Sequence, residues 1–421
     1  MTDREKTTRS NQIATVVFVV GLFAVPVWQA VSDHSEYRAG RRSQATPRVL
    51  TIVQLPWQAW RQTDDQSDVI ERVGAWNSHL RQALSDHELD VTEDSPFHQF
   101  VRPRIQSALT SLFNECNSKV FVGEDGWLFY APDLAHVGAK SKNVGVPPYQ
   151  DAREAIADFR RQLEERGIEL ILLPTPVKPC VYPEQLNGGI SSDRPLWAPG
   201  FDDLLRWMDD QQIAYVDPTE TLVKMKSSAK GPSFLKTDTH WTPAAMMATA
   251  KQLALKVFDR VTFQQPGGTV YHSVKREVVN RGDLAKQLPG LPGGGDRFPA
   301  ETVVTERVLN AAGQPWRDDG QPKVMLLGDS FANIYSDESM GWGVSAGLAE
   351  RLSLALQRPV RTIVLNDGGA TGTREVLSQR LNTDPGYLAR VRVVIWQFAV
   401  RDLTSKEWTP IDLAASEGVT P

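Results

Sequence analysis

The stretch V-M-L-L-G-D-S-F, residues 324–331, combines a short apolar run with a turn and a serine. Apolar residues bounded by glycine are typical of a strand that is covered on both faces. Gly328 allows a tight turn after this strand, and the turn would lift the hydroxyl of Ser330 clear of the sheet. The stretch therefore predicts a buried strand with a serine just past its carboxyl end.

Apolar strands alternate with amphipathic helices on both sides of this stretch. Such alternation is typical of an α/β fold with a parallel sheet covered by helices on both faces, and ligands of such sheets bind beyond the carboxyl ends of the strands. Ser330 and Asn366 both fall at such ends. The predicted strands are 168–174, 213–217, 323–327, 361–366 and 391–398, and the predicted helices are 151–167, 204–208, 243–258, 345–356 and 373–382.

Local signals define several element boundaries. Residues 120–130 predict a hairpin with a Gly-Glu-Asp-Gly turn. Asp151 and Glu154 have the spacing of a capping box, and Thr242 before proline predicts a helix N-cap. Residues 262–322, which are rich in glycine, proline and charge, are expected to form a long irregular insertion, with a flexible loop at 290–295.

The N-terminus predicts a membrane anchor. Residues 13–31 form an almost unbroken apolar run without a charged residue, and at ~1.5 Å per residue such a helix spans about 28 Å, close to the thickness of a hydrocarbon core. A cleaved signal peptide is the alternative, but V-W-Q-A lacks an A-x-A-like site. The flanking charges do not decide the orientation. A single anchor before a large domain favours an extracytoplasmic domain, at a bacterial inner membrane.

Four regions follow from these patterns. Residues 1–34 are expected to hold a cytoplasmic tail and the anchor, and 35–118 a tether and a helical segment. Residues 119–410 are expected to form the α/β domain, and 411–421 a tail. Helical spacing within the second region involves Val69, Val73, Trp76, Leu80 and Leu84, and then residues 97–113.

Composition excludes some classes of function. The chain has 421 residues and a net charge of −5, without a basic patch interleaved with aromatic residues, so nucleic acid is not an expected partner. Metal-ligand spacings are absent from the sequence, and no cofactor is expected. The two cysteines, Cys116 and Cys180, could form a disulfide or remain buried thiols.

The stretch K-T-D-T-H-W-T-P, residues 236–243, supplies a partner for the serine. A serine hydroxyl needs a base within hydrogen-bond reach, and the base needs a group that fixes its tautomer. In an extended segment Asp238 and His240 would point to the same side. Separately, G-D-S is often a simple turn and a lone histidine is usually structural. Together they predict a nucleophile, Ser330, with His240 as base, Asp238 as orienting acid and the Ser330 N–H as an oxyanion donor.

With these two motifs, the chain resembles the AlgJ/AlgX-type family of SGNH-hydrolase-like proteins. The matching segments cover roughly residues 100–405 and keep the family's order, in which D-x-H-W precedes G-D-S-F. This order is the reverse of that in ordinary SGNH enzymes, while Ala332 breaks the G-x-S-x-G elbow of α/β-hydrolases. The segments are K-V-F-V-G-E-D-G-W-L-F-Y, L-P-T-P-V-K-P-C-V-Y-P-E-Q-L, T-D-T-H-W-T-P, L-L-G-D-S-F and V-V-I-W-Q-F-A-V-R-D-L.

The resemblance implies an SGNH-like (flavodoxin-like) fold and a membrane-anchored O-acetyltransferase that modifies an exported, alginate-like polysaccharide. It implies Ser330 as the acylated residue, His240 as base and Asp238 as acid, with an acyltransferase of the MBOAT type as the membrane partner that delivers acetyl groups. Gly328, Asn366, Gly368 and Arg401 are candidate oxyanion or substrate groups by their position in the sequence.

Two features depart from the family pattern. The family commonly has W-E in the last strand, whereas this chain has Trp396 and Gln397. The chain also ends soon after this strand, which leaves no room for the C-terminal carbohydrate-binding module of AlgX-like members. An acetylesterase with the same three residues and a non-catalytic scaffold for polysaccharide assembly are the alternative functions.

Overall fold

A five-stranded parallel sheet forms the centre of the α/β unit, as expected from the sequence. In the computed structural model the strand order is β4-β3-β9-β7-β8, and all four pairings are parallel. Consecutive strands of this kind require crossover connections, which the helices provide. The strands are β3 (Glu169–Thr175), β4 (Ala214–Tyr215), β7 (Val324–Gly328), β8 (Val360–Val364) and β9 (Val393–Ala399).

The structure describes residues 27–40, 46–61, 63, 76, 79–80, 83–84, 119–139, 148–186, 188–228, 231–263, 270–288, 298–318, 322–366 and 368–413. The chain divides into two compact units, residues 1–109 and 110–421.

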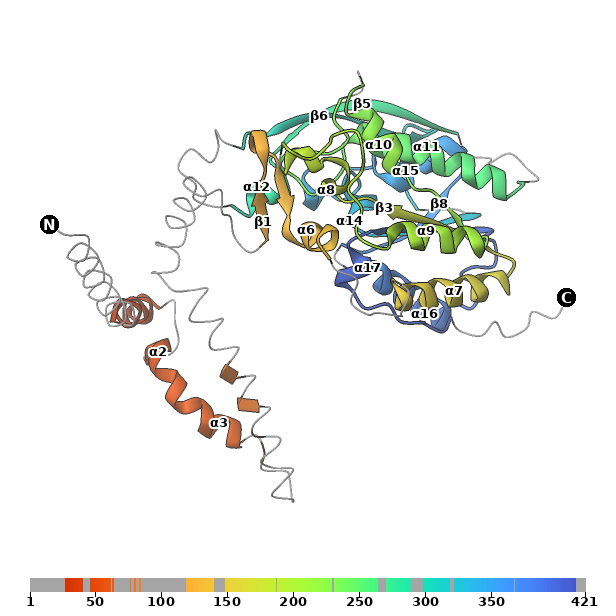
Figure 1. Ribbon diagram of the computed structural model, residues 1–421. Helices are drawn as coiled ribbons and strands as arrows, with labels where there is room; N and C mark the ends of the chain where they lie inside the picture. The colour runs from red at the N-terminus through yellow and green to blue at the C-terminus, as the bar shows by residue number, and fades with distance from the viewer. Residues whose placement is uncertain are drawn as a thin grey trace. The chain divides into compact units, whose positions relative to one another are not determined.

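Helices cover both faces of the sheet. In Figure 1, α11 (Pro243–Arg260) and α15 (Leu348–Leu356) lie above the strands, and α7 (Gln150–Glu164) and α16 (Gly369–Thr383) lie below them. Burial on both faces explains why β7 and β9 are apolar along almost their whole length.

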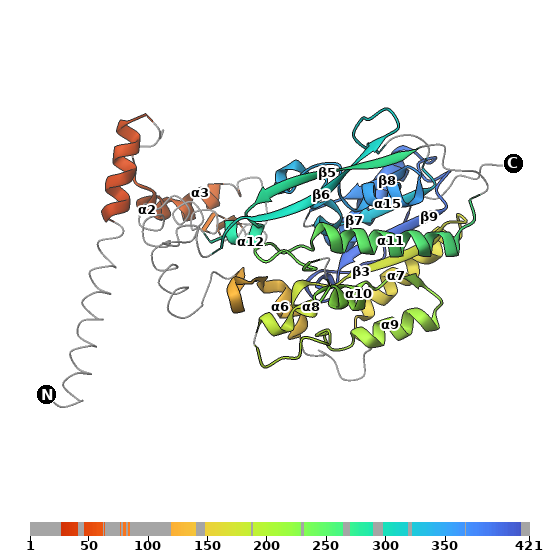
Figure 2. The same cartoon turned by 90° about the horizontal axis from the view of Figure 1, so that it is seen from above.

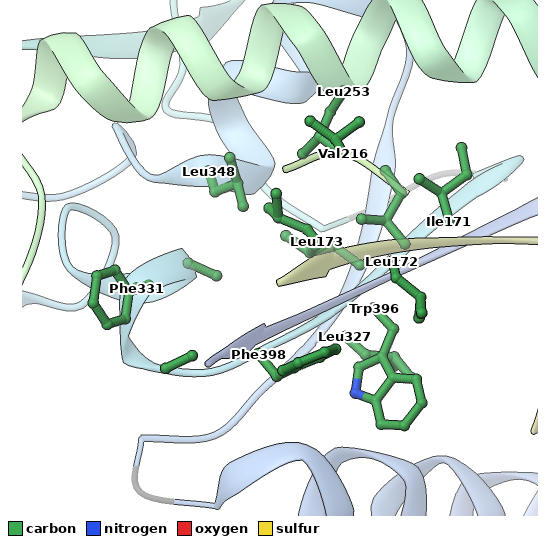
Figure 3. Packing of buried hydrophobic residues seen from close by; sticks show 14 of the residues in the cluster. Ile171, Leu172, Leu173, Val216, Leu253, Leu327, Phe331, Leu348, Trp396 and Phe398 are labelled. Atoms are coloured by element: carbon green, nitrogen blue, oxygen red, sulfur yellow. The ribbon is translucent and has the colours of Figure 1, made fainter. Parts of the chain in front are cut away.

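Aromatic and aliphatic side chains fill both layers of the core. Trp396 packs edge-to-face on Phe159 of α7. The guanidinium of Arg374 from α16 lies over the Trp396 ring in a cation–π contact. Figure 3 shows Trp396 on one side of the strands and Val216 and Leu253 on the other. The site at the strand ends is therefore built on a rigid, fully packed platform.

Shorter elements surround the strand ends. The hairpin expected at 120–130 is confirmed, since β1 (Val120–Val122) pairs antiparallel with β2 (Leu128–Tyr130). The other helices among the described residues of this unit are α6 (Ala131–Val137), α8 (Lys178–Val181), α9 (Phe201–Asp210), α10 (Thr219–Met225), α12 (Asp283–Lys286), α14 (Ser330–Asn333) and α17 (Asp402–Ser405), with short 3₁₀ turns η2 (Glu124–Gly126), η3 (Pro183–Gln185) and η4 (Glu338–Met340).

The prediction of an irregular insertion at 262–322 is wrong. This segment contains two long strands, β5 (Tyr271–Asn280) and β6 (Glu301–Asn310), which pair antiparallel over ten residues. Figure 2 shows them running side by side along α15. Their β-branched residues favour strands, but both strands also carry many charged residues, because much of their surface is exposed. The loop expected at 290–295 lies outside the described residues.

Two predictions about helix starts have different outcomes. Thr242 caps α11 as expected, with its hydroxyl accepting from the Ala245 N–H at 3.4 Å. The prediction of a capping box at Asp151 and Glu154 is wrong. Helix α7 begins at Gln150, directly after Tyr149, which has a left-handed conformation. Asp151 is therefore inside the helix, and Glu154 instead accepts from the amide of Gln150.

The first unit is described only in part. Residues 27–38 are helical, and α2 (Arg48–Thr51), η1 (Ile52–Gln54) and α3 (Leu55–Arg61) follow. Among the described residues, no helix is long and apolar enough to span a bilayer, and the predicted anchor up to residue 26 lies outside them. Cys116 also lies outside, while Cys180 is a buried free thiol.

Candidate active site

Three side chains from two distant segments form a continuous chain of hydrogen bonds. The Nδ1 atom of His240 lies 2.7 Å from Oδ1 of Asp238, and its Nε2 atom lies 2.8 Å from Oγ of Ser330. Ser330 follows β7 as the first residue of α14. The structure thus brings together the acid, the imidazole and the hydroxyl that the sequence singles out.

The acid–imidazole segment is a tight loop, which corrects the expected extended conformation. A bridge between Phe234 and Trp241 closes the loop, and the Leu235 N–H donates to the carbonyl of His240. Asp238 and His240 still face each other, because Oδ1 of Asp238 accepts from both the backbone N–H and the ring of His240. The loop leads directly into α11.

Four hydrogen-bond donors converge on the Asp238 carboxylate. Besides the two from His240, Oδ2 accepts from the Asp283 N–H at 3.0 Å and from Nε1 of Trp342 at 2.8 Å. Burial alone would raise the pKa of Asp238, but these donors and the imidazole lower it below its ordinary value. Asp238 is therefore held as a carboxylate that can fix the tautomer of His240.

The imidazole of His240 is buried against the ring of Phe331, at a centroid distance of 4.9 Å. Burial would lower the pKa of His240, but the hydrogen bond and the charge of Asp238 raise it above 6.5. An imidazole with a raised pKa is a stronger proton acceptor, which suits a general base.

Side chains from the β5–β6 insertion hold the loop in place. The carboxylate of Glu301 accepts from the N–H groups of Lys236 and Thr237, both at 2.8 Å, and from the hydroxyl of Thr237. Gly282 packs against the same backbone, and a Cβ at this position would lie 2.2 Å from the carbonyl oxygen of Thr237. Only glycine permits this approach.

Asp283 also supports the loop that carries Asp238 and His240, and it lies close enough to both residues to be considered as a metal ligand. Asp238, His240 and Asp283 have ligand atoms within 4.8 Å of one another. However, the Asp283 carboxylate already accepts from the N–H and hydroxyl of Thr239, at 2.7 and 2.8 Å. Because the carboxylate oxygens are engaged with donors, the arrangement fits a hydrogen-bonded acid–imidazole pair better than a cation site.

Hydrogen bonds through Asp329 connect the turn that carries Ser330 to β9. Oδ1 of Asp329 accepts from the Phe331 N–H and from the Gln397 amide, while Oδ2 accepts from the Ala399 N–H. The amide oxygen of Gln397 in turn accepts from the Asp329 N–H at 2.9 Å. Gly328 is required here by close packing, since a Cβ would lie 2.7 Å from that of Ala332.

A cavity of about 240 Å³ opens beside Ser330. Arg401 lines it, as does Gly369, the neighbour of the predicted Gly368. Asn366 does not line this cavity; its side chain is exposed and hydrogen-bonded to Asn333 and Asp337. Of these predicted residues, Arg401 lines the cavity beside Ser330. Gly368 is only adjacent to a lining residue, Gly369, and Asn366 lies outside the cavity. The remaining lining residues are Tyr130, Pro132, Asp329, Asp402, Ser405 and Lys406.

Arg401 is fixed by a buried ion pair. Its Nη1 atom lies 3.1 Å from Oδ1 of Asp133, and its guanidinium lies over the rings of Tyr130 and Phe331. Burial would lower the pKa of Arg401, but the charge of Asp133 and its neighbours raises it. A permanent positive charge is thus held at the wall of the cavity.

A comparison with known protein families finds one whose model matches most of the α/β unit. The family described as "SGNH hydrolase-like domain, acetyltransferase AlgX" matches residues 120–400, which is more than half of the chain. The chain belongs to this family.

Individual members of the family have modest sequence identity with the chain. The probable alginate O-acetylase AlgJ of Pseudomonas aeruginosa is 26% identical over 259 residues, 58% of this chain and 62% of that protein. The corresponding protein of Pseudomonas putida is 28% identical over 306 residues, 70% of this chain and 73% of that protein. The first of these alignments spans less than two thirds of its relative.

A solved structure supports the fold. The O-acetyltransferase domain of Pseudomonas putida AlgJ superposes with a TM-score of 0.52 and 23% identity, covering 68% of this chain and 93% of that domain. The SGNH-like fold expected from the sequence is therefore confirmed.

Several residues that hold the site were not singled out from the sequence. These are Gly282, Asp283, Glu301 and Trp342 around the acid, and Asp329 beside the serine. The R-G-D tripeptide at 281–283 was the only available signal for the first two, and it gives no indication of the distant loop that it supports. Gln397 departs from the family pattern, and its amide acts here as both a hydrogen-bond donor and an acceptor.

Proposed function

We propose that this protein is an O-acetyltransferase that transfers acetyl groups to hydroxyls of an exported, alginate-like polysaccharide through an acyl-enzyme on Ser330. The observation that carries the proposal is the Asp238–His240–Ser330 hydrogen-bond chain, with links of 2.7 and 2.8 Å, at the edge of a cavity. Family membership and the names of the relatives support the choice of acyl transfer over other serine chemistry.

In the first half-reaction, His240 Nε2 takes the proton of Ser330 while Oγ attacks the acetyl carbonyl of the donor. The Ser330 N–H is suited to bind the developing oxyanion, since it stands at the first position of α14 and has no acceptor within that helix. The protonated imidazole then gives its proton to the leaving group. The carboxylate of Asp238 stabilises the imidazolium throughout.

In the second half-reaction, a sugar hydroxyl replaces the departed donor. His240 takes the hydroxyl proton as the sugar oxygen attacks the acetyl carbon of acetyl-Ser330. The bond from this carbon to Oγ breaks, and the imidazolium returns its proton to Ser330. The positive charge of Arg401 lies beside both steps and is suited to bind an anionic group of the donor or the acceptor.

The proposal includes a setting at a membrane. Residues 13–31 would anchor the chain in a bacterial inner membrane, with the catalytic unit on the extracytoplasmic side. An acyltransferase of the MBOAT type would then supply acetyl groups from within the membrane. A protease-protection experiment on cells or spheroplasts tests the topology: cleavage of the α/β unit only from outside the cytoplasm agrees with it.

The enzymatic proposal is tested with the full-length chain in detergent, a chromogenic acetyl ester as donor and an alginate oligosaccharide as acceptor. We expect acetylated oligosaccharide that disappears in Ser330→Ala. Release of the chromophore without acetylation of the sugar would favour an acetylesterase. Turnover that persists in Ser330→Ala would contradict both readings.

A further inference from the structure

A second acidic side chain lines the cavity beside Ser330. Asp402 is the first residue of α17, shortly after the end of β9, and it is only 3% exposed. Its carboxylate accepts from the Ala370 N–H at the start of α16. One oxygen, Oδ2, has no hydrogen-bond partner among the described residues.

Gly369 packs closely against this oxygen. Gly369 has a φ of +59°, and a Cβ at this position would lie 3.3 Å from Oδ2 of Asp402. A side chain other than glycine would be strained and would also crowd the carboxylate. Gly369, Asp402 and Ser330 all line the same cavity.

A buried carboxylate oxygen without a hydrogen-bond partner is costly, because its lost hydration is not replaced. The nearby positive charges of Arg401 and Lys406 offset part of this cost, whereas burial and the charge of Asp329 raise the pKa of Asp402 to about 7. A ligand in the cavity that brings a hydrogen-bond donor to this carboxylate would offset the remaining penalty. The missing hydrogen bond therefore indicates a ligand that carries a hydrogen-bond donor.

We propose that Asp402 binds a hydroxyl of the acceptor sugar through its carboxylate and orients the sugar for attack on acetyl-Ser330. The two substrates of the proposed reaction differ in the groups that they offer. An acetyl ester presents only acceptor oxygens, whereas a sugar presents several hydroxyl donors, so a carboxylate oxygen selects the sugar. This inference rests on the proposed function and adds the residue that distinguishes the acceptor from the donor.

The experiment compares two rates for the full-length protein and for its Asp402→Asn variant. One is release of the chromophore from the acetyl ester without acceptor, and the other is transfer to an alginate oligosaccharide. In the variant the Ala370 N–H keeps an acceptor, but the anionic oxygen is lost. We expect the ratio of transfer to hydrolysis to fall by about tenfold, mainly through a higher KM for the acceptor.

The matched control is Glu350→Gln. Glu350 is also buried, and burial raises its pKa to about 7, but it lines a different cavity. The ratio of transfer to hydrolysis should be the same in this variant as in the wild type, and thermal unfolding of both variants reports any loss of folded protein.

The outcomes separate this inference from the proposed function. Equal losses of hydrolysis and transfer in Asp402→Asn would overturn it and assign Asp402 to the oxyanion or to the fold. An unchanged ratio would overturn it as well. Monodeoxy oligosaccharides sharpen the assignment: one of them should be a poorer acceptor for the wild type and show no further loss with Asp402→Asn. Failure of Ser330→Ala to abolish turnover would contradict the proposed function itself.

Discussion

The two segments that meet at the active site are held in different ways. Ser330 follows β7 in the central sheet, and β9 fixes its turn through Gln397 and the Ala399 N–H. Asp238 and His240 instead lie in a loop that is held by side chains from an insertion, notably Glu301 and Asp283. The central sheet therefore positions the nucleophile, whereas the insertion that contains β5 and β6 positions the acid–imidazole pair.

The difference has a consequence for tolerance to substitution. A parallel sheet with buried faces holds its strand ends through many backbone hydrogen bonds, so losing one side-chain contact is partly compensated. A loop without regular structure relies on a few contacts, and each one matters more. We therefore expect substitutions in the insertion to affect catalysis more than comparable substitutions beneath the serine.

The largest expected effect belongs to the acid itself. Asp238→Asn would preserve the shape of the site but allow the amide to hold the wrong tautomer of His240, and kcat should fall by about 10⁴-fold. Initial rates of acetyl ester cleavage measure the loss. A variant with more than a tenth of the wild-type kcat would show that the carboxylate does not orient a catalytic base.

The second effect tests the insertion. Gly282→Ala would push a methyl group into the Thr237 backbone and displace the Asp238 loop, and a displacement of about 1 Å can lower kcat by roughly 10²-fold. Gly188→Ala is the matched control, since a Cβ there meets nothing within 4 Å. Wild-type kinetics in Gly282→Ala would mean that the insertion does not position the acid.

The third effect tests the sheet side of the comparison. Gln397→Leu removes the donor to Asp329 and the acceptor for its N–H while keeping an apolar body of similar size. We expect a loss of about 1–3 kcal/mol of unfolding free energy, because buried polar groups lose partners, but only about a tenfold loss of kcat. Urea unfolding and ester cleavage measure the two quantities. A catalytic loss larger than that of Gly282→Ala would reverse the comparison.

The smallest effect is a displacement of the pH profile. His240 must be neutral to accept a proton, and the hydrogen bond from its ring to Asp238 raises its pKa above 6.5 against the effect of burial. Asp283 also raises this pKa, and Arg401 lowers it. The value of kcat/KM for ester cleavage should therefore rise with pH through a midpoint above 6.5.

Asp402 titrates near the same range, because its pKa is raised to about 7, so the profile is repeated with Asp402→Asn. The acidic limb should remain in that variant if it belongs to His240. A limb that disappears with Asp402, or a midpoint below 6.5, would contradict the assignment.

The sequence predicted one side of this comparison better than the other. The strand before Ser330 was recognisable because a strand buried on both faces is a short apolar run, and the D-x-H spacing drew attention to Asp238 and His240. The strands of the insertion were missed because their exposed, charged residues obscure the two-residue period. Strand propensity in V-K-R-E-V-V-N was present but weaker than the signals of the neighbouring glycine and proline residues.

The supporting contacts were beyond the reach of a single sequence for a different reason. Glu301 lies more than sixty residues after the loop that it binds, and Trp342 lies about a hundred residues after Asp238. Nothing in local spacing indicates such pairs, since they result from the tertiary fold. Asn366 shows a different limit of the sequence: it follows β8 near a strand end, but its side chain is exposed and bonds to Asn333 and Asp337 outside the cavity, so a strand end does not by itself place a residue in the site.

The most direct test of catalysis through Ser330 is to trap the acyl-enzyme. Full-length protein is mixed with the chromogenic acetyl ester, quenched in acid, and examined by intact mass and peptide mapping. We predict a single acetyl group on Ser330, which an alginate oligosaccharide removes as acetylated sugar, and none in Ser330→Ala. Acetylation at another residue with unchanged transfer, or transfer in the absence of Ser330, would contradict this mechanism.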